Sequence, residues 1–350
     1  MENTLKKMKT IDGAFGEGGG QVLRSSLTLS MITKTPIELI NIRAKRSKPG
    51  LMRQHLTAIE AAKTICNAEV VGADLGAETI QFYPGEIQAG DYNFSIGTAG
   101  STVLVCQTIL LALAYAPEHS RVRFEGGTHN GLSPSLCFFE QSYLPVLRQM
   151  GLTCDLDVKR LGFYPAGGGE WQIAVAPFER WKSISFAASK KLSGLSSQRC
   201  KMTVLLNNYD VSIAEKEVKI ALNYLDWEGV PYEIKKGQAR GKGNTFQIHF
   251  QDGEKHLMFE SFAQKKVVER DVALTATKHL KAFLDAEVAV EEYLADQLLL
   301  PMALAKGGEF TTTEPSDHTL TNIAVIEQML PIQFQVEQLS KRQWNIKVLS

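Results

Sequence analysis

One histidine stands among residues that suit nucleophilic catalysis. His318 follows Ser316 and Asp317, which are suited to capping a helix, and Thr321 and Asn322 come one turn later. A neutral imidazole is nucleophilic near pH 7 and forms a labile bond to phosphorus, so it suits reversible nucleotidyl transfer. The chain has seven histidines, and a lone histidine is more often structural. His318 is therefore a candidate that needs support from the surrounding elements.

Glycine-rich segments could bring backbone amides close to a phosphate group, above all where a helix follows. The segments are residues 16–20, 97–100, 126–127, 167–169 and 307–308. The first two precede predicted helices. The sequence contains neither a P-loop nor the glycine pattern of dinucleotide-binding folds. Phosphate binding and ordinary tight turns are therefore equally compatible with the glycines alone.

A basic segment precedes another predicted helix and could hold a polyanion. Its five cations are Arg43, Lys45, Arg46, Lys48 and Arg53. The chain has 38 basic and 38 acidic residues, so a polyanion must be bound locally and not by a global positive field. A run of charge is usually a solvated loop. Here a Pro-Gly pair constrains the segment, and it occupies the repeat position that holds His318 in a later unit, which favours function.

Hydrophobic periodicity places these residues in a repeated order of elements. Three stretches each predict an apolar helix, a strand, a loop, an amphipathic helix and two strands. The predicted helices and the strand between them are 22–32, 37–43 and 53–66 in the first unit, 101–116, 121–125 and 135–150 in the second, and 292–305, 309–313 and 320–330 in the third. The closing strands end near residues 83, 175 and 348.

The third unit begins later than the first interval predicts. The first helices begin near residues 22 and 101, which puts a third near 180, but it begins near 292. The intervening region predicts strands at 201–206, 232–236, 245–250 and 256–260 and helices at 212–227 and 267–286. We therefore expect an α/β protein whose large domain, 1–183 and 286–350, is interrupted by a small α/β domain, 184–285. A cleft between the two is the expected place for a site.

Composition and cysteine usage narrow the class of protein. A chain of 350 residues with 44% hydrophobic residues can bury a large core. Five widely spaced cysteines without a Cys-x-x-Cys pair predict reduced thiols in a cytoplasmic protein. No histidine has the spacing of a structural zinc site. The polar first ten residues predict no signal peptide, and no apolar run reaches the length of about 20 residues that a membrane span needs.

Six motifs resemble those of the RNA 3'-terminal phosphate cyclases, in order and over nearly the whole chain. They are 12–24 (DGAFGEGGGQVLR), 48–56 (KPGLMRQHL), 126–130 (GGTHN), 162–170 (GFYPAGGGE), 293–297 (YLADQ) and 318–323 (HTLTNI). The resemblance implies three βαβαββ repeats with a small α/β domain inserted between the second and third. It also implies a reaction in which a histidine takes AMP from ATP and releases pyrophosphate. AMP then passes to an RNA 3'-phosphate, and the 2'-hydroxyl displaces it to form a 2',3'-cyclic phosphate.

Carried over by motif, the resemblance assigns roles to single residues. His318 would accept AMP, and Glu17 would hold Mg²⁺ or Mn²⁺ on the phosphates. Tyr293 and Pro134 would lie on the two faces of the adenine. The other nucleotide contacts would be Gln107, Phe138, Leu294, Ala295, Asp296 and Gln297 around the base and Arg24, Arg53 and Gln54 at the phosphates. An aromatic ring, a carboxylate and arginines are the residue types that this chemistry needs.

The resemblance leaves some points open. Leu161 stands where a basic residue is frequent, and Trp171 stands where a small aliphatic residue is usual. A non-catalytic, cyclase-like branch of the same fold acts in RNA processing but lacks the histidine. A transferase of the related fold that acts on small phosphorylated metabolites is disfavoured by the last two motifs. The expected partner is RNA with a 3'-phosphate, and a homodimer is one option for the oligomeric state.

Overall fold

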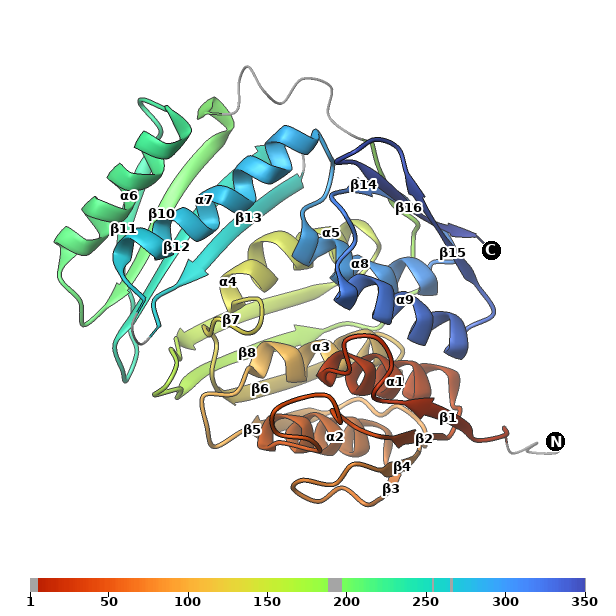
Figure 1. The fold of residues 1–350 in the computed structure, drawn as a ribbon. Helices are drawn as coiled ribbons and strands as arrows, with labels where there is room; N and C mark the ends of the chain where they lie inside the picture. Colours follow the sequence, from red (N-terminus) through yellow and green to blue (C-terminus); the bar gives the residue numbers. More distant parts are fainter. Residues whose placement is uncertain (1–5, 188–196, 254, 265–266, 350) are drawn as a thin grey trace.

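The structure is a computed structural model that describes residues 6–187, 197–253, 255–264 and 267–349. Within these ranges the chain forms four sheets of four strands each, covered by helices (Figure 1). This arrangement confirms the α/β class expected from the sequence.

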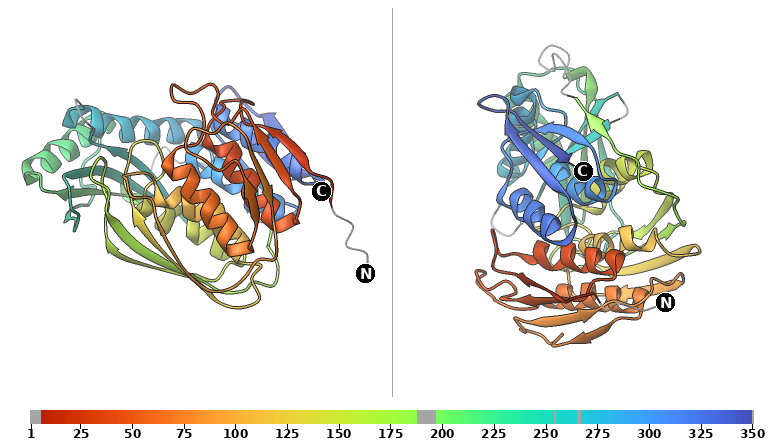
Figure 2. Two further views of the ribbon diagram at one scale, coloured as in Figure 1. Left: turned by 90° about the horizontal axis from the view of Figure 1, so that it is seen from below. Right: turned by 90° about the vertical axis from the view of Figure 1, so that its right-hand side faces the viewer.

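The first unit has the order strand, helix, strand, helix, strand, strand. Its elements are β1 Lys9–Asp12, α1 Gly20–Thr33, β2 Ile37–Ile40, α2 Arg53–Cys66, β3 Glu69–Val71 and β4 Ile80–Tyr83. The strands are ordered β1-β2-β4-β3, and β1 and β2 run parallel. Alternate residues of β2 and β4 are buried, so one face of the sheet packs against the two helices. Figure 2 shows these helices on the inner side of the sheet.

The second unit repeats this order and the strand arrangement, here β5-β6-β8-β7. Its elements are β5 Asp91–Ser95, α3 Thr102–Leu113, β6 Ser120–Gly126, α4 Leu136–Phe138, η1 Phe139–Tyr143, α5 Leu144–Gln149, β7 Cys154–Arg160 and β8 Gly169–Val175. The sequence predicts one helix over 135–150, but the structure has a π-helical turn in its middle. Pro145 has no N–H to donate to the carbonyl of Gln141. His256 Nδ1 lies 3.0 Å from that carbonyl oxygen instead.

The third unit has the same strand arrangement once more, β9-β14-β16-β15. Its elements are β9 Ser185–Phe186, α8 Glu292–Leu304, β14 Glu309–Thr312, α9 Asp317–Met329, β15 Gln333–Gln338 and β16 Trp344–Leu349. Strand β9 lies inside 184–285, which the sequence assigns to the small domain, yet it pairs with β14. The extra elements therefore follow the first strand of the third unit and do not separate complete second and third units.

The fourth sheet belongs to what we call the inserted segment, 200–286. Its elements are β10 Cys200–Asn207, α6 Val211–Leu225, β11 Tyr232–Lys236, β12 Gly243–Asp252, β13 Lys255–Phe262 and α7 Glu269–Ala286. The strands are ordered β11-β10-β12-β13, so β13 is an edge strand. Helices α6 and α7 pack together, and β13 contacts η1 of the second unit. The division of the chain into two domains stays a prediction.

The main core lies where the helices of the three units meet. Helix α1 contacts α3 and α9, and α8 contacts α9. The middle of α3 is almost completely buried, which explains its apolar sequence. None of the helices in the described ranges is long and apolar enough to cross a membrane. The five cysteines are free thiols, and burial raises the pKa of Cys137 to about 12, so this thiol is poorly suited to act as a nucleophile.

Candidate active site

His318 lies in the first turn of helix α9. The sequence predicts the start of this helix at residue 320, but the structure begins it at Asp317. Ser316 is the N-cap, and its hydroxyl accepts a hydrogen bond from the backbone N–H of Thr319 at 3.3 Å. Asp317 carries negative charge in the first turn, where the helix dipole favours it. The backbone of His318 is fixed in the helix, whereas its side chain is 52% exposed and accessible to a ligand.

The imidazole of His318 meets the carboxylate of Glu17. The distance from His318 Nε2 to Glu17 Oε2 is 3.1 Å, and the Glu17 side chain is only 12% exposed. Glu17 lies in the glycine-rich loop between β1 and α1. Its backbone N–H donates to Thr321 Oγ1 at 3.2 Å, which ties this loop to α9. The structure thus brings together two residues, one from each end of the chain, that the sequence assigns to one site.

The glycines of this loop have a steric role. A Cβ atom at Gly16, where φ is +57°, would lie 2.0 Å from Thr321 Oγ1. A Cβ atom at Gly19 would lie 1.8 Å from Glu17 Oε1. Gly16 is therefore needed for its positive φ and its close approach to α9, and Gly19 leaves room for the Glu17 carboxylate.

The basic segment folds over the same loop. Arg46 forms an ion pair with Glu17 Oε2, and Lys45 Nζ donates to the carbonyl of Gly16 at 3.2 Å. Arg43 has an internal role, because its guanidinium donates to the carbonyls of Lys48 and Gly50 at 2.7 Å each. These contacts place the basic segment beside Glu17, which also meets His318, while its predicted role in holding a polyanion stays a prediction. The ion pair between Arg46 and Glu17 could not be predicted from the sequence, in which Arg46 is only one of five cations in the segment.

A buried polar cluster lies behind the histidine. Burial lowers the pKa of Arg24 to about 10, while the nearby Asp296 and Glu17 act to raise it, so Arg24 is a cation at neutral pH. Burial raises the pKa of Asp296, while His318, Asn322 and Arg24 act to lower it. Asn322 Nδ2 donates to Asp296 Oδ1 at 3.1 Å, and its Oδ1 accepts from Ser25 Oγ at 2.7 Å. The cluster joins helices α1, α8 and α9.

Helix α2 brings two more motif residues to this region. Gln54 Oε1 accepts the backbone N–H of Ser101 at 2.7 Å, so it ties the first unit to the start of α3. His55 Nδ1 accepts the backbone N–H of Met52 at 3.0 Å, and a Cβ atom at Gly20 would lie 2.6 Å from His55 Nε2. Burial, with Arg24 and Arg43 nearby, lowers the pKa of His55 to about 3. It is therefore neutral, and Nε2 carries the proton.

His55 was missed as a site residue, although the motif that contains Gln54 also contains it. Arg53 begins α2 and is exposed. In the described part of the chain it makes no ion pair. Its predicted contact with phosphate stays a prediction.

The residues predicted to contact the adenine are of two kinds, polar or aromatic residues at the site and apolar residues buried in the core. Tyr293 in α8 is 43% exposed, and its ring meets the edge of His279 with centroids 5.9 Å apart. Gln107 Nε2 donates to Gln297 Oε1 at 2.6 Å, which joins α3 to α8. The side chains of Phe138, Leu294 and Ala295 are each about 1% exposed. These three pack in the core, so in this structure they support the site from behind. The sandwich of adenine between Tyr293 and Pro134 stays a prediction.

The two departures from the family pattern lie away from His318. Leu161 donates its backbone N–H to the carbonyl of Gln238 at 3.0 Å and so contacts the inserted segment. Trp171 is buried, stacks on Phe124 with ring centroids 4.6 Å apart, and donates through Nε1 to Thr102 Oγ1 at 2.9 Å. Trp171 is therefore a core residue of the second unit.

Glu17 fits a divalent cation of the kind expected. Its Oε1 is buried and has no hydrogen-bond partner in the described structure, so one carboxylate oxygen is left for another ligand. The described residues contain no group of three His, Cys, Asp or Glu side chains that could hold a metal by themselves. Magnesium is commonly bound by one or two carboxylates together with substrate phosphates. The donor set thus suits a cation that arrives with a nucleotide.

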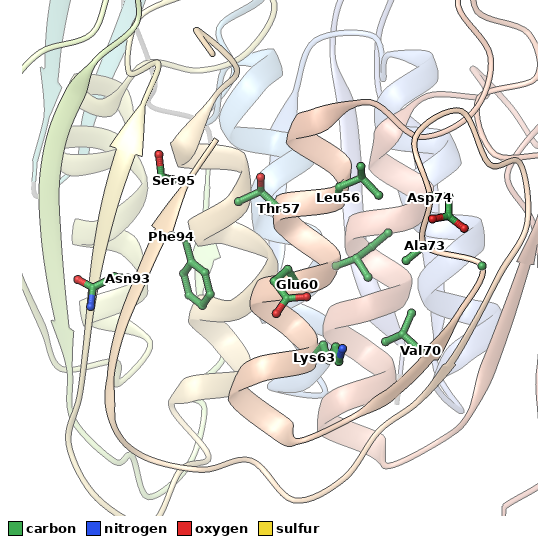
Figure 3. Close-up of a pocket in the computed structure, with 12 residues that line it drawn as sticks. Leu56, Thr57, Glu60, Lys63, Val70, Ala73, Asp74, Asn93, Phe94 and Ser95 are labelled. Atoms are coloured by element: carbon green, nitrogen blue, oxygen red, sulfur yellow. The ribbon is translucent and has the colours of Figure 1, made fainter. Parts of the chain in front are cut away.

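A separate pocket of about 680 Å³ is lined by α2, β5 and residues 70–74 (Figure 3). Its walls include Glu60 and Lys63 of α2 and Asn93 and Ser95 of β5, and none of the predicted site residues lines it. This pocket is therefore separate from the residues that the sequence predicts for the site. We place the site at His318, because the polar groups that the chemistry needs converge there.

Fold and site together define a class of protein with three βαβαββ units, in which a histidine of the third unit meets a glutamate of the first. The family model described as RNA 3'-terminal phosphate cyclase matches residues 15–336. The chain belongs to the RNA 3'-terminal phosphate cyclase family.

Among solved structures, the chain is similar to the enolpyruvyl transferase NikO from Streptomyces tendae. The TM-score is 0.36 with 9% sequence identity, and the match covers 98% of this chain and 48% of that one. The chain thus spans about half the length of that structure. A likeness at this level supports no inference about function.

Proposed function

We propose that the protein is an active, ATP-dependent RNA 3'-phosphate cyclase that works through a covalent His318–AMP intermediate. The observation that carries this proposal is the 3.1 Å contact between His318 Nε2 and the shielded carboxylate of Glu17. A non-catalytic, cyclase-like factor would have no use for a histidine held in this way. The cations Arg24 and Arg46 both lie close to the same carboxylate, which suits a site that receives a triphosphate.

In the first step His318 Nε2 attacks the α-phosphorus of ATP. A phosphorus–nitrogen bond forms, the bond from the α-phosphorus to the bridging oxygen breaks, and pyrophosphate leaves. Glu17 orients the imidazole and takes the Nε2 proton as the phosphorus–nitrogen bond forms, and the arginines offset the negative charge of the phosphates. A divalent cation bound with the nucleotide would supply further charge neutralisation at the phosphate oxygens.

Two further exchanges complete the reaction. An oxygen of the RNA 3'-phosphate attacks the phosphorus of the AMP group, which forms a phosphoanhydride and releases His318. The vicinal 2'-hydroxyl then attacks the phosphorus of the 3'-phosphate, AMP leaves, and the 2',3'-cyclic phosphate closes. Each step replaces one activated phosphorus bond by another, so the protein has mainly to position groups and stabilise charge.

Labelling with radioactive ATP and magnesium tests the first step. We expect acid-labile, alkali-stable AMP on the wild-type protein and none on His318→Asn. His119→Asn is the matched control, because His119 is an exposed histidine that belongs to no predicted site. An unlabelled wild-type protein would contradict the proposed function.

The RNA product tests the complete reaction. We expect RNA with a 3'-phosphate to become resistant to phosphatase and RNA with a 3'-hydroxyl to stay unchanged. RNA that is bound but remains fully sensitive to phosphatase would favour the non-catalytic, cyclase-like alternative.

A further inference from the structure

The edge strand of the inserted segment runs along the loop that carries Pro134. Two alternate residues of β13, Glu260 and Phe262, and Gln264 just after the strand contact this loop. Glu260 binds Ser135, the ring of Phe262 lies 6.4 Å from that of His129, and a Cβ atom at Gly131 would lie 1.9 Å from Gln264 Nε2. The inserted segment therefore covers the loop over most of its length.

The strongest of these contacts is made by a buried carboxylate. Glu260 is 8% exposed. It accepts hydrogen bonds from Ser135 N at 2.8 Å and from Ser135 Oγ at 2.6 Å. Ser135 is the residue after Pro134 and the N-cap of α4. Glu260 of the inserted segment thus holds the chain directly after Pro134, the residue predicted to lie on one face of the adenine.

Helix α4 does not need Glu260 for its own capping. The Ser135 hydroxyl already accepts the backbone N–H of Phe138 at 3.0 Å, which is the local N-cap bond. Burial of a carboxylate is costly, and burial raises the pKa of Glu260 to about 7. The bonds from Glu260 to Ser135 therefore add little to helix capping, although burying the carboxylate is unfavourable. They are best explained as fixing the position of Ser135 and of the neighbouring Pro134.

The opposite face of the predicted site is held in a similar way. Glu291 is buried and caps α8, accepting hydrogen bonds from Tyr293 N at 2.9 Å and from Leu294 N. Burial is the main cause of the raised pKa of both Glu291 and Tyr293, and the charge of Glu260 adds to it, so Glu260 lies near both residues. One glutamate holds the Pro134 side, and the other holds the Tyr293 side.

We infer that Glu260 is a positioning residue for ATP, through which the inserted segment sets the distance between Pro134 and Tyr293. This inference rests on the proposed function. In the described part of the chain Glu260 bonds to Ser135 and Gln247 and not to His318 or Glu17, so we expect its effect to be confined to the adenine end of the nucleotide.

The test measures ligand binding by calorimetry in His318→Asn protein, where no AMP can be transferred. Two ligands are compared: ATP, and tripolyphosphate, which carries the phosphates without the base. We expect Glu260→Gln to weaken ATP binding by about threefold to tenfold, the effect of one lost hydrogen bond, and to leave tripolyphosphate binding unchanged. Ser135→Ala, which removes the hydroxyl end of the same contact, is expected to act in the same direction.

Glu217→Gln is the matched control. Glu217 is also a buried glutamate of the inserted segment, its pKa is raised by burial to about 7, and it accepts a hydrogen bond from Asn244 at 2.6 Å. It has no contact with the Pro134 loop, so ATP binding should not change. Equal weakening of both ligands by Glu260→Gln, no weakening of either, or equal effects of the two glutamine variants would overturn the inference. Failure of the wild-type protein to label with AMP would overturn the proposed function while this binding comparison still decides the role of Glu260.

Discussion

The absence of a side chain at Gly19 is expected to matter for catalysis. The backbone angles of Gly19 are ordinary, so alanine can adopt them, but its Cβ atom would overlap Glu17 Oε1 and the carboxylate would have to move. We predict that Gly19→Ala displaces the carboxylate and lowers AMP labelling by about tenfold or more, because precise positioning is lost. The melting temperature should change little, because the loop between β1 and α1 is not part of the hydrophobic core.

Gly307→Ala is the control for this change. Gly307 also has ordinary backbone angles, and its nearest neighbour would be Ser183 Cβ at 3.4 Å, which is a normal contact. We expect full labelling of this variant. Full labelling of Gly19→Ala as well would show that the close packing of the loop has no role in the chemistry.

The sequence predicts residues of the site when the motif itself carries their chemistry. His318 and Glu17 are of this kind. The ion pair of Arg46 could not be predicted, because it depends on the way one loop folds over another. The same holds for Glu260, whose partner Ser135 lies 125 positions earlier in the chain. A carboxylate in a strand gives no local signal that it will cap a distant helix.

Among the helices, the N-cap residue of α8, Glu291, predicts that the stability of the fold depends on pH. Burial raises the pKa of Glu291 in the folded protein to about 8, from an ordinary value of 4.5. The folded protein therefore holds a proton that the unfolded chain releases, so this group favours folding at low pH. Its contribution is lost as the pH rises from about 4.5 through 8. We predict that Glu291→Gln loses less stability than wild type between pH 5 and pH 8.

Urea unfolding at several pH values measures this difference. The variant should be less stable than wild type at pH 5, because glutamine cannot accept both backbone N–H groups. The quantity that decides is the change of unfolding free energy with pH, not its value at one pH. Parallel curves for the two proteins would contradict the prediction.

Helices could be predicted more fully than strands, for a physical reason. The pattern of apolar residues locates α2 over the same residues that the structure gives it. The first strands of the units, β1, β5 and β9, leave no such trace, since β9 has only two residues and β5 has a single buried one. Only the family resemblance implied them. The π-helical turn at η1 also escaped, because its cause combines Pro145 with a partner from the inserted segment.

For the whole molecule, ligand binding should stabilise the junction of all three units. Glu17 comes from the first unit, Gln107 from the second and His318 from the third, so a nucleotide that contacts them would bind the folded state only. At about 100 times its dissociation constant, a ligand of this kind adds about 2.7 kcal/mol to the unfolding free energy. We predict that ATP raises the melting temperature of His318→Asn protein by several degrees. An unchanged melting temperature at saturating ATP would contradict a site shared by the three units.

The short strand β9 has a consequence for how the protein is made. Its partner β14 is paired through Glu309 and Phe310, and all of the inserted segment lies between them. During synthesis, Ser185 and Phe186 leave the ribosome long before their partners exist. The sheets of the first two units can form while the chain is still growing, but the sheet of the third unit cannot be completed until the chain has been made through β16. His318 lies only eight residues beyond Phe310, so the nucleophile is made soon after the strand that pairs with β9 and before the remaining strands of that sheet, β15 and β16.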